Sequence, residues 1–189
     1  LFLGLSCGDD GDDDVIVIPE ADRNEQQVID NDSLLGYLQT HYINSSFLIN
    51  NQNISLDEIV INSLPDDGVL PEPDVNTLLI DLVETHTTTY SETDYEYYVL
   101  KLNQGGGENT PNFSDKVRVS YEGNLMDATV FDSSYSSADF DLTATIAEWG
   151  RVLPEFNNAI DFNVNGDGTI TFNDPGIGVM FLPSGLGYY

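Results

Sequence analysis

Residues 116–121 read Lys-Val-Arg-Val-Ser-Tyr, a strict alternation of polar and apolar side chains. Successive side chains of a β-strand point to opposite faces, so Val117, Val119 and Tyr121 share one face. Such a period of two predicts a strand that is buried on one side only. The second half of the chain is therefore expected to contain a sheet with one covered face.

The residues on either side continue the β pattern. Strands are expected at 97–102, 129–131, 140–142, 169–172 and 178–182. One helix is expected at 147–158, with an apolar stripe made of Trp149, Val152, Leu153 and Phe156. An antiparallel sheet covered by one short helix is an α+β fold. The three glycines at 105–107 lack the Lys-Ser/Thr of a phosphate-binding loop, so we expect a flexible connection there.

The composition excludes one class of partner. The chain has 189 residues, with 33 acidic against 5 basic side chains and a formal net charge of −28. Nucleic acids are bound through Lys and Arg, which release counterions, so we expect no nucleic-acid partner. Cys7 is the single cysteine, which excludes an intrachain disulfide.

The first residues have the pattern of an exported protein. Residues 1–8 read Leu-Phe-Leu-Gly-Leu-Ser-Cys-Gly, an apolar run too short for a bilayer span of about 20 residues. The run resembles the end of a bacterial lipoprotein signal peptide, whose cysteine is lipidated. This resemblance implies a lipid on Cys7, then an acidic linker up to residue 31. It implies an outer-membrane lipoprotein of the bacterial cell envelope, on the periplasmic or the outer face.

Residues 32–94 are expected to form an N-terminal extension that packs on the second half. The segment is rich in Asn, Asp and Pro, so an irregular structure is expected for most of it. A helix is predicted from Asp32, with Leu34, Leu38 and Tyr42 at helical spacing.

Two features bear on metal binding. His41 and His86 lack a cluster of Cys, His or carboxylate residues at metal-ligand spacing, so both are interpreted as ordinary histidines. Residues 163–174 place Asn and Asp at alternate positions, which resembles a calcium-binding loop. The same stretch fits a β-hairpin with an Asn-Gly-Asp-Gly turn at 165–168, and we favour the hairpin. No metal ion is therefore expected.

Four motifs of the second half follow one another in an order known from one family. They are Val-Arg-Val-Ser-Tyr-Glu-Gly at 117–123, Phe-Asp-Ser-Ser at 131–134, Thr-Ile-Ala-Glu-Trp at 145–149 and Leu-Pro-Ser-Gly-Leu-Gly-Tyr at 182–188. Together they resemble the FKBP-type peptidyl-prolyl cis/trans isomerases across residues 95–189. The resemblance implies an FKBP-like antiparallel sheet wrapped on one short helix.

The resemblance also implies a site for rotation about X-Pro bonds. The implied catalytic residues are Tyr121, Phe131, Asp132, Ile146, Trp149 and Tyr188. Trp149 would be the floor under the proline ring, with Phe140 as a further wall of the pocket. The N–H of Ile146 and the hydroxyl of Tyr188 would hold carbonyl oxygens, and Asp132 would order the rim.

Three departures from the family pattern are visible. Glu148 stands where the family has glycine, and an insertion at about 161–175 lengthens the connection after the helix. Family members also continue beyond Tyr189 into a last central strand, so we expect a fragment of a longer protein without that strand. The sheet edge left free should be exposed and destabilising.

The implied function is to accelerate rotation about X-Pro bonds in exported proteins, by non-covalent binding of the twisted amide in an aromatic pocket. Proline-containing polypeptides would be the partners, no cofactor would be needed, and the lipid on Cys7 would attach the protein to a membrane. The alternative is a surface lipoprotein that binds or chaperones proline-containing segments without catalysis.

Overall fold

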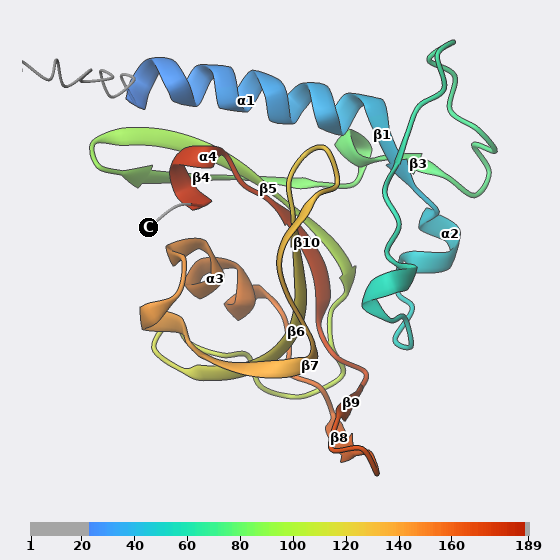
Figure 1. The fold of residues 1–189 in the computed structure, drawn as a ribbon, viewed down its shortest axis with the longest axis vertical. Coiled ribbons are helices and arrows are strands. Elements are labelled where there is room, and N and C mark those ends of the chain that lie inside the picture. The colour runs from blue at the N-terminus through green and yellow to red at the C-terminus, as the bar shows by residue number, and fades with distance from the viewer. Residues whose placement is uncertain (1–22, 188–189) are drawn as a thin grey trace, which may run out of the picture.

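The computed structural model describes residues 23–187, which form the predicted α+β fold with antiparallel sheets (Figure 1). The helices are α1 (Arg23–Thr40), α2 (Ser45–Leu48), α3 (Ala147–Val152) and α4 (Ser184–Gly187), with 3-10 turns η1 (Leu56–Glu58), η2 (Leu79–Asp81), η3 (Leu142–Ala144) and η4 (Leu153–Glu155). The strands are β1 (His41–Ile43), β2 (Asn62–Ser63), β3 (Thr77–Leu78), β4 (Glu84–Tyr90), β5 (Thr93–Asn103), β6 (Lys116–Asn124), β7 (Val130–Asp141), β8 (Asp161–Val164), β9 (Ile170–Asn173) and β10 (Ile177–Phe181).

The strand β5 organises the core because both of its faces are covered. It lies between β10 and β4 in an antiparallel sheet. One face carries Tyr97 and Val99, which pack in a cluster with residues of α3 and α4. The opposite face carries Tyr98 and Leu100, which pack in a second cluster with α1, β1 and α2. Alternate side chains of β5 therefore pack in two apolar clusters, one on each face of the strand, and neither face is left to solvent.

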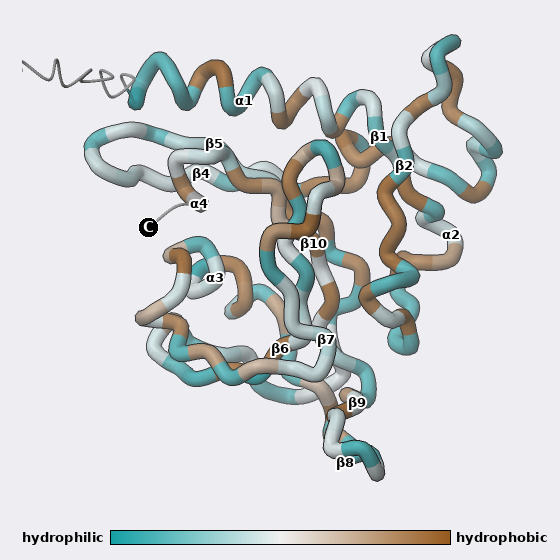
Figure 2. The backbone as a smooth tube through the Cα atoms, viewed as in Figure 1, coloured by the Kyte–Doolittle hydropathy of each residue, from teal (hydrophilic) through white to brown (hydrophobic). Residues whose placement is uncertain are grey.

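The N-terminal extension is more regular than the irregular segment expected from the sequence. The helix α1 begins at Arg23 instead of Asp32, so residues 23–31 are helical and not linker, and the helix ends before Tyr42, which lies on β1. Figure 2 shows apolar stretches recurring along α1 between polar ones. The helix packs against β5 and α4, so the extension does cover the second half of the chain. None of the described helices is long and apolar enough to cross a membrane.

Polar contacts explain why the first half of α1 could not be predicted from the sequence. Val28 and Ile29 are 51% and 59% exposed, so no buried apolar stripe marks this part of the helix. The Tyr98 hydroxyl donates a hydrogen bond to the Asn31 side chain at 2.8 Å, and the Ser184 N–H donates one to Asp30 at 3.1 Å. Both bonds join residues far apart in the chain, so they leave no periodic signal in the sequence.

The hairpin of β6 and β7 forms a sheet of its own. The strand β7 is continuous where two separate strands, 129–131 and 140–142, were expected. Within residues 23–187 no ladder joins this hairpin to the β10-β5-β4 sheet, so the single sheet expected from the sequence is divided. In Figure 1, α3 lies between the two sheets. Its Val152 packs on the β5 side, while its Trp149 packs on β6 and β7.

The helix predicted at 147–158 ends early. After Val152 the chain continues as the 3-10 turn η4, which contains Pro154 near its start. Proline has no N–H to donate and restricts the residue before it, so the α-helical bonds stop there. The turn places Glu155 beside β4 and carries the chain to Phe156 in the core.

Residues 161–173 form the hairpin of β8 and β9 and not a calcium loop. Val164 pairs with Ile170, and the N–H of Asn165 donates to the carbonyl of Thr169 at 2.8 Å. Asp174, which would be the last calcium ligand, follows the other end of β9 and accepts a hydrogen bond from Asn103 at 2.7 Å. Ligands of an EF-hand loop must converge on one ion, so the hairpin prediction is confirmed.

The glycines at 105–107 are held in place rather than flexible. Gly105 has φ +90°, and a Cβ there would overlap the carbonyl oxygen of Asn157. The N–H groups of Gly106 and Gly107 donate to the carbonyls of Asp174 and Asn158, each at 2.9 Å. Glycine is needed at position 105 because the backbone of Asn157 approaches closely and φ is positive.

Candidate functional site

Three aromatic rings meet where α3 packs on the β6–β7 hairpin. The ring centroid of Tyr121 lies 5.4 Å from that of Phe140 and 5.4 Å from that of Trp149. Phe140 and Trp149 lie 5.1 Å apart, and all three pairs are close to edge-to-face. Such T-shaped pairs are favoured by the ring quadrupoles. All three side chains are half-buried, so the aromatic cluster presents apolar surface to the solvent.

A short connection brings the rings of β7 and α3 together. At the end of β7 the side chain of Asp141 accepts a hydrogen bond from the N–H of Thr143 at 3.1 Å, which turns the chain into η3. The helix α3 then begins after Ile146, whose carbonyl accepts the N–H of Trp149 at 3.1 Å. The connection is too short to separate Phe140 from Trp149, so their contact follows from local sequence.

The side chain of Tyr121 is oriented by Asp132. Its hydroxyl donates a hydrogen bond to the Asp132 carboxylate at 2.7 Å, across the β6–β7 pair. This hydrogen bond raises the pKa of Tyr121, because the carboxylate accepts from the protonated phenol, and desolvation adds to the effect. Asp132 thus contacts one ring of the aromatic cluster, and its role at the rim of a pocket stays a prediction.

Phe131 is placed apart from the three rings. It is 66% exposed, and its ring lies over Gly123, where a Cβ would come within 2.6 Å of it. Among the described residues it makes no ring contact with Tyr121, Phe140 or Trp149. Phe131 and Asp132 are successive strand residues and point to opposite faces. Because the Asp132 side chain lies on the face of Tyr121, the Phe131 side chain lies on the other face.

The remaining predicted site residues have different outcomes. Ile146 is half-buried at the start of α3, and its N–H donates to no partner within residues 23–187. Tyr188 and Cys7 lie outside the described residues. The structure therefore gathers Tyr121, Asp132, Phe140, Ile146 and Trp149 in one region and leaves Phe131 beside it.

Glu148, the departure from the family pattern before Trp149, is a buried carboxylate. It is 1% exposed, and its Oε1 accepts a hydrogen bond from Arg151 at 2.7 Å. Its Oε2 is buried without a partner in the described part of the chain. A glycine would leave the space of this side chain empty, so Glu148 fills that buried volume and binds Arg151.

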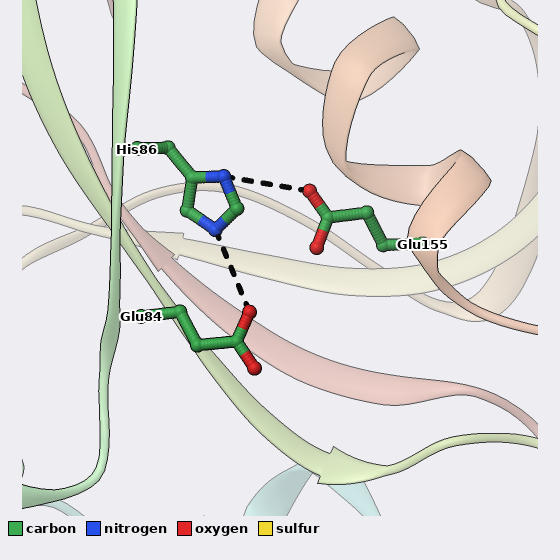
Figure 3. Close-up of side chains that lie close together, drawn as sticks. All are labelled: Glu84, His86 and Glu155. Atoms are coloured by element: carbon green, nitrogen blue, oxygen red, sulfur yellow. Dashed lines mark ion pairs between the residues drawn. The ribbon is translucent and has the colours of Figure 1, made fainter.

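The two histidines differ in their surroundings. His41 stacks on Tyr37 at 3.7 Å between ring centroids, as expected of an ordinary histidine. His86 instead lies between two carboxylates, those of Glu84 and Glu155 (Figure 3). This cluster was not predicted from the sequence, since Glu155 comes from a distant turn. The spacing of two between Glu84 and His86 is the feature that could have been recognised, because it places both side chains on one face of a strand.

Comparison with known proteins finds a partial similarity to a prolyl isomerase. A stretch of 61 residues is 43% identical to the peptidyl-prolyl cis-trans isomerase Mip of Coxiella burnetii (strain RSA 493 / Nine Mile phase I). The similarity supports the FKBP family. It covers 31% of this chain and 25% of Mip, so the chain matches about a quarter of that relative. No family model matches the chain, and no solved structure does.

Proposed function

We propose that this chain is a peptidyl-prolyl cis/trans isomerase of the FKBP type, and that the aromatic cluster is its binding site. The contact of Tyr121, Phe140 and Trp149, with Asp132 bonded to Tyr121, is the observation that carries the proposal. The partial similarity to Mip supports it.

The chemistry requires an apolar surface rather than a nucleophile. An X-Pro amide rotates over a barrier of about 18–20 kcal/mol, because the planar bond has partial double-bond character. Twisting removes that resonance, so the twisted amide has less charge separation than the planar form. An apolar site therefore disfavours the planar ground state more than the transition state, and this difference accelerates the rotation.

Each side chain of the cluster has a distinct part in this proposal. Trp149 forms the floor under the proline ring, and Phe140 and Tyr121 form the walls. The N–H of Ile146 has no partner within residues 23–187 and is free to donate to a substrate carbonyl. Asp132 holds the Tyr121 ring in position through its hydrogen bond. The role of the Tyr188 hydroxyl as a second donor remains a prediction.

Proline-containing polypeptides are the proposed substrates, and extended or unfolded segments suit the surface next to the cluster. Five large apolar side chains are at least 44% exposed around the turn and strands of the β6–β7 hairpin, namely Leu125, Met126, Val130, Phe131 and Tyr135. Apolar side chains exposed along one hairpin offer another polypeptide apolar surface to contact.

An NMR titration with a short X-Pro peptide tests the proposal. Trp149 is the only tryptophan, so its indole N–H gives a single reporter signal. We expect this signal to shift with the X-Pro peptide and not with the same peptide carrying Ala for Pro. Exchange between the cis and trans peptide signals should also become faster in the presence of the protein. An unchanged exchange rate at saturating peptide would contradict catalysis.

A non-catalytic binding module is the second candidate. The exposed position of Phe131, apart from the rings of the cluster, favours it, because an open surface binds a peptide without enclosing the twisted amide. A shift of the Trp149 signal without faster exchange would be the result expected of such a module.

We also propose that Cys7 is lipidated and attaches the protein to the bacterial cell envelope, at the outer membrane. The apolar run before Cys7 and the acidic residues after it support this proposal. Mass spectrometry of the protein recovered from membranes of a bacterial host should find a lipid on Cys7. Recovery of unmodified Cys7 from those membranes would contradict the proposal.

A further inference from the structure

A histidine and two carboxylates converge between β4 and η4. Glu84 and His86 are two residues apart on β4 and therefore share a face of the strand. Glu155 reaches the same place from η4 (Figure 3). One ligand atom from each of the three side chains lies within 4.8 Å of the others.

Within residues 23–187 the imidazole of His86 makes only long contacts with its polar neighbours. Its Nε2 is buried without a partner in the described part of the chain, and the nearest carboxylate oxygen, on Glu84, is 3.8 Å away. Its Nδ1 is 3.5 Å from an oxygen of Glu155. Both distances are longer than good N–H···O hydrogen bonds. Stacking on Tyr97, at 5.2 Å between ring centroids, fixes the ring.

A metal ion bound by one ring nitrogen of His86, together with the two carboxylates, fits this cluster. Zinc lies about 2.0–2.1 Å from a histidine nitrogen and about 2.0–2.2 Å from a carboxylate oxygen. Two such bonds span the 3.8 Å between Nε2 and Glu84 with a bent geometry at the ion. Imidazole together with carboxylate favours zinc and related transition metals, whereas calcium and magnesium prefer oxygen ligands alone.

Lys101 of β5 is the competing cation. Its ammonium lies 3.1 Å from Glu84 and 2.8 Å from Glu155, so it holds the two carboxylates close together. The hydrogen bond to Glu155 is the main cause of the raised pKa of Lys101. The side chain is 28% exposed and reaches solvent, so it can turn away when another cation binds.

We propose that Glu84, His86 and Glu155 form a binding site for a divalent transition-metal ion, which displaces the ammonium of Lys101. The bound ion would join η4 to β4, and η4 directly follows the helix that carries Trp149. The site uses no residue of the aromatic cluster, so it stands whether or not the chain is an isomerase.

Zinc titration by calorimetry tests the site in the full chain. All proteins carry Cys7→Ser to remove the thiol, and excess Mg²⁺ occupies weak acidic sites. We expect His86→Ala to weaken zinc binding by more than about tenfold, while His41→Ala, the matched control, leaves it unchanged. Lys101→Met should tighten binding several-fold, since it removes the competing ammonium. Equal binding by the two histidine variants, or weaker binding by Lys101→Met, would overturn the site.

A second measurement needs no change at the site. NMR of the histidine ring nitrogens distinguishes His41 from His86, the two histidines of the chain. Zinc should move the ring-nitrogen signals of His86 and leave those of His41 in place. Unmoved His86 signals at a zinc concentration that saturates the calorimetric binding would refute the proposal, even if an altered variant failed to fold.

Discussion

The hydrogen bond between Tyr121 and Asp132 links a ring of the aromatic cluster to the opposite strand. It is 2.7 Å long and spans the β6–β7 pair. Because Asp132 accepts from the phenol, it limits the orientations that the Tyr121 ring can take. A pocket that acts by shape depends on such fixed orientations, since misplacement of binding groups lowers the rate.

Tyr121→Phe and Asp132→Asn are expected to lower kcat/KM for X-Pro rotation by a similar factor, roughly two- to tenfold, as for the loss of one hydrogen bond. The double variant should lose little more than either single variant, because both remove the same interaction. Asp132→Asn should also lower the pKa of Tyr121 toward that of a free tyrosine, which absorbance titration would measure. Fully additive losses would show that the two residues act independently.

Tyr98 is the residue whose ionisation should limit stability at high pH. Burial and the nearby Glu96 raise its pKa to about 12. In the unfolded chain the Tyr98 phenol loses its proton near pH 10, whereas in the folded chain it keeps the proton up to about pH 12. The contribution of protonated Tyr98 to the free energy of unfolding is therefore complete below pH 10 and is lost between pH 10 and about 12. Tyr98→Phe should cost about 1 kcal/mol at pH 7 through its lost hydrogen bonds. Denaturant unfolding should then show a smaller loss of stability above pH 10 than in the unchanged protein.

Single residues show clearly what sequence could and could not reveal about the site. Tyr121, Phe140 and Trp149 meet because strand register and a short turn place them together, and both are encoded locally. Phe131 points outward because its neighbour on β7, Asp132, is the residue that accepts the hydrogen bond from Tyr121. The partners of His86 come from separate elements, and only the tertiary fold brings them together.

Among the elements, α1 and the glycine segment were hardest to predict. The first half of α1 is held by hydrogen bonds to Tyr98 and Ser184, which no periodic pattern reports. The strands β5, β6 and β9 were expected close to where they lie, because their alternation is local. The conformation of the glycines at 105–107 is fixed by close contact with Asn157 and Asp174, which are distant in the chain.

Gly105→Ala is expected to destabilise the protein by about 2–4 kcal/mol, because the added Cβ meets the Asn157 carbonyl and φ is positive. Gly166→Ala is the matched control, since a Cβ there has open space and φ is not positive. Its effect should stay within about 0.5 kcal/mol. Urea unfolding of both variants measures the difference. A loss of less than about 1 kcal/mol for Gly105→Ala would contradict the close approach.

At the scale of the whole molecule, residues 23–94 belong to the same fold as the second half of the chain. The strand β4 pairs with β5 across the boundary expected between residues 94 and 95. The helix α1 covers the face of β5 that carries Tyr98 and Leu100. The α+β class and the positions of β5, β6, β9 and β10 could be predicted from sequence. The division of the described strands into four separate sheets, with α3 between the β6–β7 hairpin and the β10-β5-β4 sheet, could not, since it depends on which strands find a partner.

A chain of residues 95–189 is therefore expected to lose cooperative folding. It lacks β4 and α1, so the apolar face of β5 is exposed to water and the stabilisation from its burial is lost. Calorimetry should show no sharp unfolding transition for this piece, whereas residues 23–189 should unfold cooperatively. A cooperative transition of the shorter piece would show that the N-terminal extension is dispensable.

The rate of cis-to-trans rotation of an X-Pro peptide, measured by exchange NMR, tests the central claim most directly. The unchanged chain, Trp149→Ala and Phe162→Ala would be compared, because Phe162 is an exposed aromatic residue outside the cluster. We predict acceleration by the unchanged chain and by Phe162→Ala, and its loss, by about tenfold or more, in Trp149→Ala. No acceleration by the unchanged, folded chain, or equal rates for Trp149→Ala and Phe162→Ala, would contradict an isomerase site in the aromatic cluster.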